Sequence, residues 1–171
     1  NISAYPYFIE DIDILDKLFD IKPYQKTVPI LVGCVDNNRA RVLFNEYFNK
    51  VENLFYIDSG NEVWDGQVVC GVRAKGKTIA PPVVELYPDI LNTQEIFKSE
   101  MSCTELMLEK PQQFITNLQA AVITLSYLLD IITGDLKRNQ STFNIKTKGM
   151  RSTNAPWAEN LDKIRQRKII L

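Results

Sequence analysis

The residues best suited to chemistry follow a short apolar run near the start of the chain. Residues 30–35 form this run, Asp36 ends it, and Arg39 and Arg41 come within the next turn and a half. A buried parallel strand reads as a continuous apolar run, and the C-terminal ends of such strands face the crevice where open α/β sheets bind ligands. A carboxylate for a metal ion and guanidinium groups for phosphate are what a nucleotide site requires.

The same residues also allow a purely structural interpretation. Asp36 could cap the helix predicted to follow the apolar run, with both arginines solvated on its surface. Aspartate is a common helix-capping residue. The spacing of these residues alone therefore does not decide between a nucleotide site and a capped helix.

The rest of the composition narrows the possible chemistry. The chain has no histidine, which excludes a Ser-His-Asp triad, a Cys-His pair and imidazole zinc ligands. Its three cysteines, Cys34, Cys70 and Cys103, are far apart and form no C-x-x-C pair. We expect reduced thiols, as in a cytosolic protein, with Cys34 and Cys70 as core thiols inside apolar strands. Catalysis must then rest on carboxylates, arginines, lysines, a thiol or a cofactor.

Length and charge indicate a single globular domain. The 171 residues are 45% hydrophobic and 24% charged, within the normal range for soluble proteins. A net charge of −1 predicts no nucleic-acid partner. The charged N-terminal region is not a signal peptide, so we expect a cytoplasmic protein. Because the chain begins with Asn1 rather than Met, we interpret it as a fragment of a longer protein.

The periodicity of apolar residues predicts an α/β fold. We expect strands over residues 2–5, 30–35, 54–58, 67–72 and 143–147, and helices over residues 11–19, after 36 to about 49, and 111–133. Asp65-Gly66 reads as a turn, and Pro81-Pro82 predicts an irregular segment over 76–88. The residues after 150 read as a polar and basic peripheral tail.

The predicted 111–133 helix carries one broad apolar face, with Pro111 at its start and Gly134 at its stop. The members of this face recur at three- and four-residue steps: Phe114, Ile115, Leu118, Val122, Leu125, Leu129 and Ile132. Polar residues interrupt the helix too often for a membrane span, so we expect no membrane association. A core helix or a dimer helix is the better interpretation, and we predict a two-fold homodimer.

Several motifs together resemble one known family. The chain contains no G-x-x-x-x-G-K-[ST] loop and no G-x-G-x-x-G after a strand. However, the segment VGCVDNNRAR and the helix after it resemble the ThiF/MoeB family of ubiquitin-activating-enzyme-like adenylyltransferases. The matching residues, in order, are Asp36, Asn37, Arg41 and Asn45. The stretches IDSGNEVWDGQVVCG, SCTE at residues 102–105 and FITNLQAAVITLSYLLDIITG are similar to the ThiF-like branch encoded in bacterial and plasmid gene clusters. The resemblance covers residues 1–150 and leaves 151–171 as a tail.

This resemblance implies a Rossmann-like ThiF-type domain with a mixed sheet of parallel and antiparallel strands. It implies a nucleotidyltransferase that uses ATP and Mg²⁺ to adenylate the C-terminal carboxylate of a ubiquitin-like or sulfur-carrier-like protein. Asp36 would be the magnesium ligand, and Asn37 and Arg41 would bind the nucleotide. Arg39 is added to this site as a phosphate-binding base on its spacing alone. Cys103 falls where sulfur-transferring members keep a reactive cysteine.

Two features keep a second interpretation open. The family's glycine-rich phosphate loop is missing from these residues, so the fragment alone is expected not to hold ATP. The zinc-binding C-x-x-C pairs of many members are missing too. The alternative is a non-catalytic α/β module for dimerisation or partner binding. For Cys103, acidic neighbours favour a structural thiol, whereas proximity to a helix start would favour a nucleophile.

Overall fold

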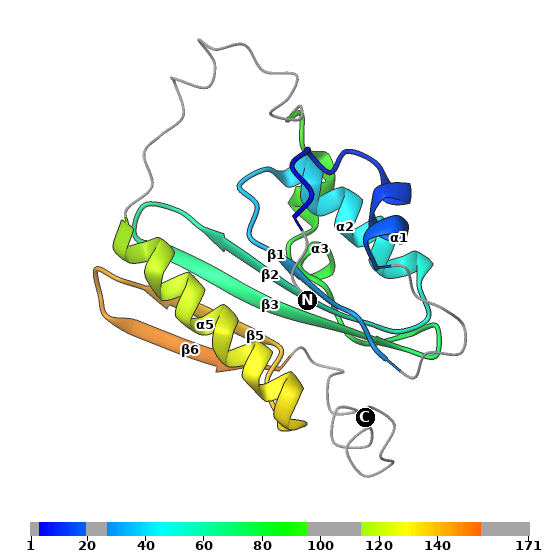
Figure 1. Ribbon diagram of the computed structural model, residues 1–171. Helices are drawn as coiled ribbons and strands as arrows, with labels where there is room; N and C mark the ends of the chain where they lie inside the picture. The colour runs from blue at the N-terminus through cyan, green and yellow to red at the C-terminus, as the bar shows by residue number, and fades with distance from the viewer. Residues whose placement is uncertain (1–3, 20–26, 96–113, 155–171) are drawn as a thin grey trace.

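The computed structural model describes residues 4–19, 27–95 and 114–154 as an α/β fold built on one sheet (Figure 1). Its helices are α1 (Ile12–Phe19), α2 (Asn38–Lys50), α3 (Val83–Leu86), the 3-10 helix η1 (Pro88–Asn92) and α5 (Phe114–Thr133). Its strands are β1 (Ile30–Gly33), β2 (Leu54–Asn61), β3 (Asp65–Ala74), β4 (Lys77–Ala80), β5 (Gln140–Asn144) and β6 (Gly149–Thr153).

The sheet is mixed, as the sequence predicts. Strands β1 and β2 are parallel and joined through α2, whereas every other pairing is antiparallel. The strand order is β1-β2-β3-β5-β6. Because β2 pairs with one side of β3 along most of its length, β4 and β5 share the other side of β3, one after the other.

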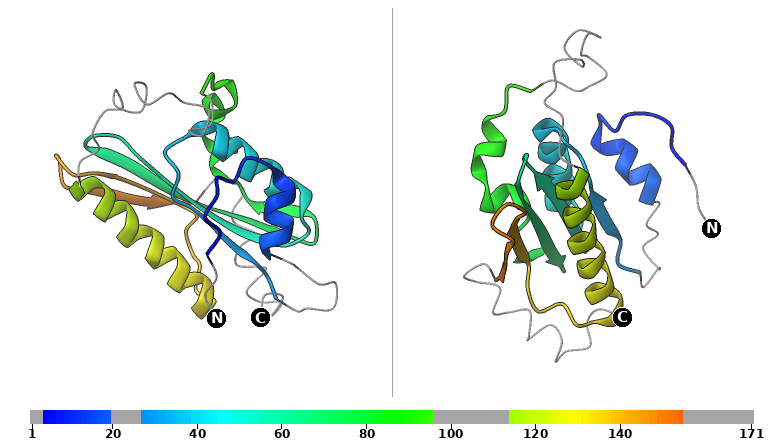
Figure 2. Two further views of the ribbon diagram at one scale, coloured as in Figure 1. Left: turned by 45° about the horizontal axis from the view of Figure 1, so that its top comes forward. Right: turned by 90° about the vertical axis from the view of Figure 1, so that its left-hand side faces the viewer.

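Side chains of the central strands point alternately to the two faces of the sheet, and each face has its own hydrophobic core. Phe55 and Ile57 of β2 point to the face that α5 covers, and Leu54 and Tyr56 point to the face that α2 covers. Figure 2 shows the sheet between α5 on one side and α1 with α2 on the other. This three-layer arrangement is the usual solution for burying both faces of a sheet.

The two long helices are bounded by specific local chemistry. Asn37 is the N-cap of α2, and its side chain accepts a hydrogen bond of 3.1 Å from the backbone N–H of Ala40. Gly134, with a φ of +69°, follows α5. The N–H of Gly134 bonds to Ile131 and that of Asp135 to Asp130, which is a Schellman motif. The predicted stop at Gly134 is confirmed.

The prediction of an irregular segment over residues 76–88 is wrong. Lys75 and Gly76 both have positive φ and form a two-residue turn that pairs β4 with β3. Pro82 is then the N-cap of α3, and a Cβ at Gly71 would come within 2.9 Å of its Cα. The glycine on β3 therefore lets the proline segment lie against the sheet.

Three smaller expectations also need correction. Asp65 and Gly66 belong to β3 rather than to a turn, because Glu62 donates to the carbonyl of Asp65 and so places the turn before it. The last strands are 140–144 and 149–153, so the region after 150 begins as part of the sheet. Residues 4 and 5 lie in no strand, and residues 1–3 lie outside the described residues.

Candidate functional site

A cavity of about 690 Å³ opens at the C-terminal ends of β1 and β2. Its walls come from the loop after β1, the end of β2, the η1 region and the first turns of α5. Asp36 and Arg41 both line it. The cavity thus lies where open α/β sheets bind their ligands, beyond the carboxyl ends of parallel strands.

A buried ion pair forms the base of this cavity. The Nε of Arg41, on α2, lies 3.0 Å from Oδ1 of Asp58, on β2. The Asp58 side chain is 1% exposed and the Arg41 side chain 10%. Two charges removed from water to this degree require close pairing and further hydrogen bonds, because desolvation is costly for each.

Arg41 has those further bonds, and they use most of its donors. Nη1 donates to Oδ1 of Asn38 at 2.9 Å, and Nη2 donates to the backbone oxygens of Val35 at 2.6 Å and Ser59 at 3.2 Å. With the bond to Asp58, four of the five N–H groups of the guanidinium are engaged. Arg41 is therefore neither solvated nor free to bind a phosphate in a bidentate manner, and it ties the loop after β1 to the end of β2.

Tyr56, two residues before Asp58 on β2, adds a hydrogen bond to the buried ion pair. Its hydroxyl donates to Oδ2 of Asp58 at 2.8 Å. Burial raises the pKa of the Tyr56 phenol well above its usual range, and the charge of Asp58 adds to the rise, so Tyr56 stays protonated as a donor. Burial also raises the pKa of Asp58, while Arg41 and Tyr56 oppose that rise.

Two glycines make room for this cluster. A Cβ at Gly33 would lie 3.0 Å from Oδ2 of Asp58, and a Cβ at Gly60 would lie 3.0 Å from Nη2 of Arg41. Both positions are buried. Any larger residue would have to displace a charged atom that is already fixed by several hydrogen bonds.

The predicted nucleotide residues separate in the structure. Asp36 is exposed and lies on the cavity wall, directly before the N-cap of α2. Asn37 is that N-cap, so the capping role considered for Asp36 belongs to its neighbour. Arg39 is exposed and, like Asn37, is not part of the described cavity lining. The cavity therefore brings Asp36 and Arg41 together without Asn37 and Arg39.

The charge of the lining suits a cation better than an anion. Three carboxylates, Asp36, Glu62 and Glu95, line the cavity, whereas Arg41 is its one cation among the described residues. Nowhere among the described residues do three or more acidic or thiol side chains lie together so as to bind a metal ion. Asp36 supplies one exposed carboxylate at this wall, and a hydrated Mg²⁺ commonly takes one or two carboxylates and keeps several waters.

Further contacts attach the surrounding elements to the cavity. The carboxylate of Glu95 accepts hydrogen bonds from the backbone and side chain of Asn38. Asn61, at the end of β2, donates to Asn117 of α5 at 2.7 Å. Thr116 donates to the carbonyl of Val63 at 2.8 Å. The start of α5 is thus held at the β2–β3 turn beside the cavity.

The cysteines differ from the expectation in one respect. Cys70 is a buried core thiol whose pKa is raised by burial, as expected. Cys34 is exposed and lines the cavity, because β1 ends at Gly33 and the chain then turns toward α2. The prediction that Cys34 is a core thiol is wrong. Cys103 lies outside the described residues.

Sequence reasoning missed the partner residues of Arg41. Asp58 reads as the end of a strand, yet β2 continues to Asn61 and buries this carboxylate completely. An acidic residue directly after the apolar run 54–57, followed by Ser59 and Gly60, was the available signal. Glu95 gives no local signal, because it reaches Asn38 across 57 residues of sequence.

Comparison with known proteins gives no family assignment. No protein-family model matches the sequence, and no curated protein matches it. Among solved structures, a crystal structure of selenomethionine PaaA superposes with a TM-score of 0.45 and 10% sequence identity. The match covers 84% of this chain and 46% of that one, so this chain spans less than half of that protein's length. A likeness this distant supports no argument about function.

We predict that Asp58→Asn lowers the free energy of unfolding by about 3–5 kcal/mol, because it leaves Arg41 charged and buried without its counterion. Urea unfolding followed by circular dichroism measures the change. Asp16→Asn is the matched control: Asp16 pairs with Lys50 on the exposed surface, so this change should leave the unfolding midpoint nearly unchanged. Equal midpoints for the two variants would contradict the account of a buried pair.

We also predict that Cys34 reacts with iodoacetamide in the native protein at neutral pH, whereas Cys70 reacts only after unfolding. Exposure of the first thiol and burial of the second give the reason. Mass spectrometry of the labelled peptides measures the labelling rates of both thiols, and the same experiment gives the rate for Cys103. If Cys70 were labelled as fast as Cys34 under native conditions, the thiol of Cys70 on β3 would not be buried, which would contradict the structure.

Proposed function

We propose that the chain forms the ligand cavity of an ATP-dependent adenylating enzyme. In this proposal Asp36 ligates Mg²⁺, and the enzyme activates the C-terminal carboxylate of a ubiquitin-like or sulfur-carrier-like protein. One observation carries the proposal: Asp36 lies on the wall of a 690 Å³ cavity at the carboxyl ends of two parallel strands. The resemblance of residues 36–45 to the ThiF/MoeB family supports the choice of reaction.

The proposed roles of the arginines follow from their contacts. Arg41 acts as a positioning residue, since two of its N–H groups bond to the backbone oxygens of Val35 and Ser59 and two bond to the side chains of Asp58 and Asn38. Arg39, exposed on the first turn of α2, is proposed as the phosphate-contacting base. Asn37 contributes by capping α2, whose N-terminal backbone dipole favours an anion beside it.

The proposal also requires groups that these residues do not supply. The cavity lining carries more carboxylates than cations, and the sequence contains no glycine-rich phosphate loop. A phosphate cradle would have to come from another part of the protein or from a partner chain. We therefore propose that these 171 residues alone are inactive.

We predict that Asp36→Ala abolishes Mg²⁺-dependent exchange of pyrophosphate into ATP in the full-length protein, because one carboxylate ligand of the ion is lost. Radioactive pyrophosphate exchange in the presence of the carrier protein is the measurement. Asp89→Ala is the control, since Asp89 is exposed on η1 and outside the cavity lining. Exchange at the wild-type rate in Asp36→Ala would remove the metal role of this residue.

A second candidate function is assembly, and helix α5 favours it. Seven large apolar side chains of α5 are at least half exposed: Phe114, Ile115, Leu118, Val122, Leu125, Leu129 and Ile132. The face packed on the sheet is the more polar one, with Thr116, Thr124 and Tyr127 buried. A contiguous apolar surface of this kind marks an interaction site.

The spacing of these exposed residues suits packing of the apolar face of α5 against another helix. From Ile115 to Ile132 the steps alternate strictly between three and four residues, which is the a/d seam of a coiled coil over about 26 Å. The flanking outward positions carry no charge, so two copies would not repel each other. By length and composition α5 could also cross a membrane. Its packing on the sheet favours a paired helix, and we propose a two-fold homodimer through α5.

We predict that the protein is a dimer in solution, with twice the 19.6 kDa mass of one chain, and that Leu125→Glu makes it a monomer. The glutamate would place a charge at the centre of the apolar seam. Light scattering coupled to size exclusion gives the mass. Leu91→Glu is the control, because Leu91 on η1 is similarly exposed but lies away from α5. A wild-type monomer at micromolar concentration would contradict the dimer.

A further inference from the structure

Among the strands that the structure describes, β6 lies at the edge of the sheet. Its partner β5 pairs with it from Gln140–Thr153 to Asn144–Gly149. Among the described residues no strand pairs with its outer side. Backbone N–H and C=O groups along such an edge can pair with an added extended chain.

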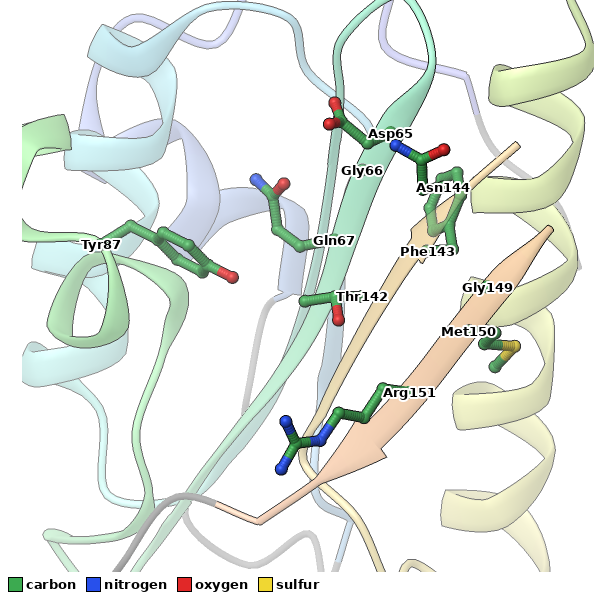
Figure 3. A pocket seen from close by; sticks show the side chains of 10 residues that line it. All are labelled: Asp65, Gly66, Gln67, Tyr87, Thr142, Phe143, Asn144, Gly149, Met150 and Arg151. Atoms are coloured by element: carbon green, nitrogen blue, oxygen red, sulfur yellow. The ribbon is translucent and has the colours of Figure 1, made fainter. Parts of the chain in front are cut away.

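A trough of about 570 Å³ runs beside this edge, on the sheet face opposite α5 (Figure 3). Its floor includes Gln67, Thr142 and Arg151, which are neighbours across β3, β5 and β6 and so point to the same face. Tyr87 reaches toward the strands from the other side, and its hydroxyl accepts a 2.8 Å hydrogen bond from Gln140. The trough is therefore lined largely by polar groups that can bond to a peptide.

The edge hairpin is cationic, and the one carboxylate among the lining residues of the trough, Asp65, lies on β3, two strands inward from β6. Residues 140–154 contain Lys146, Lys148 and Arg151 and no acidic residue, in a chain whose net charge is −1. All three cationic side chains are exposed. Two copies pairing edge to edge would bring these cations together, which is unfavourable. Residues 155–171, with four basic and two acidic residues, are also a poor electrostatic match for this edge.

We propose that β6 binds an extended acidic segment of a partner protein as an additional strand. Cross-strand neighbours share a face, so the residue opposite Arg151 would enter the trough and should be Glu or Asp. The residue of the segment opposite Met150, which is 57% exposed on the face toward α5, should be apolar. The site thus selects a segment in which acidic and apolar residues alternate. The trough adjoins the Asp36 cavity, with Gln67 and Tyr87 lining both, but neither Arg151 nor β6 belongs to the cavity lining.

The test uses a short fluorescein-labelled peptide in which Glu and Val alternate, and fluorescence anisotropy with the intact chain. We expect saturable binding that weakens about tenfold in Arg151→Glu, as the loss of one close charge pair predicts. Arg151→Gln should give an intermediate loss. Lys77→Glu, which reverses an exposed charge on β4, should leave the affinity unchanged.

Two further peptides separate strand addition from simple charge attraction. Replacing a central Val with Pro should abolish binding, because proline removes a backbone donor from the added strand. A peptide with Lys in place of Glu should bind Arg151→Glu better than the wild-type protein. The proposal is overturned if no peptide binds, if the proline peptide binds equally well, or if Arg151→Glu and Lys77→Glu behave alike. None of these outcomes depends on adenylation activity or on Asp36.

Discussion

The structure around the cavity depends on one buried ion pair, between Arg41 and Asp58. It joins the first turn of α2 to β2, and the remaining donors of Arg41 hold the backbone at Val35 and Ser59. Asp36 is the residue after Val35, so the pair also fixes where that carboxylate stands. The cost of burying both charges is offset by hydrogen bonds, since Arg41 makes four and Asp58 accepts from both Arg41 and Tyr56. Gly33 and Gly60 leave the room that these side chains occupy.

The sequence predicts the elements of this site better than their contacts. Apolar runs and helical periodicity place β1, α2, β2 and α5 close to their observed bounds, and they place Asp36 after a parallel strand. They do not reveal that Arg41 points inward, because a lone arginine near a helix start is usually solvated. Burial of Arg41 depends on Asp58 and Ser59, which lie 17 and 18 residues away and whose pairing is a property of the fold.

Helix α5 shows why a hydrophobic pattern can misidentify the core. Its apolar seam points outward, while Thr116 and Thr124 lie buried against the sheet side. Their hydroxyls donate to the carbonyls of Val63 and Ala120, which removes the cost of burying them. The seam and the open edge of β6 are two different kinds of surface, one apolar and helical and the other cationic and extended. The sites that we propose for a second copy and for a partner segment are therefore different surfaces.

The most direct test of the central claim is to locate a divalent ion with Mn²⁺ as a paramagnetic substitute for Mg²⁺. Amide resonances of an isotope-labelled protein broaden within a limited distance of the bound ion. If Asp36 binds the ion, broadening is expected at residues 34–38 and 59–62, which surround Asp36 and the end of β2, and it is lost in Asp36→Ala. Broadening centred elsewhere, or unchanged in Asp36→Ala, would show that Asp36 does not bind the ion in this cavity.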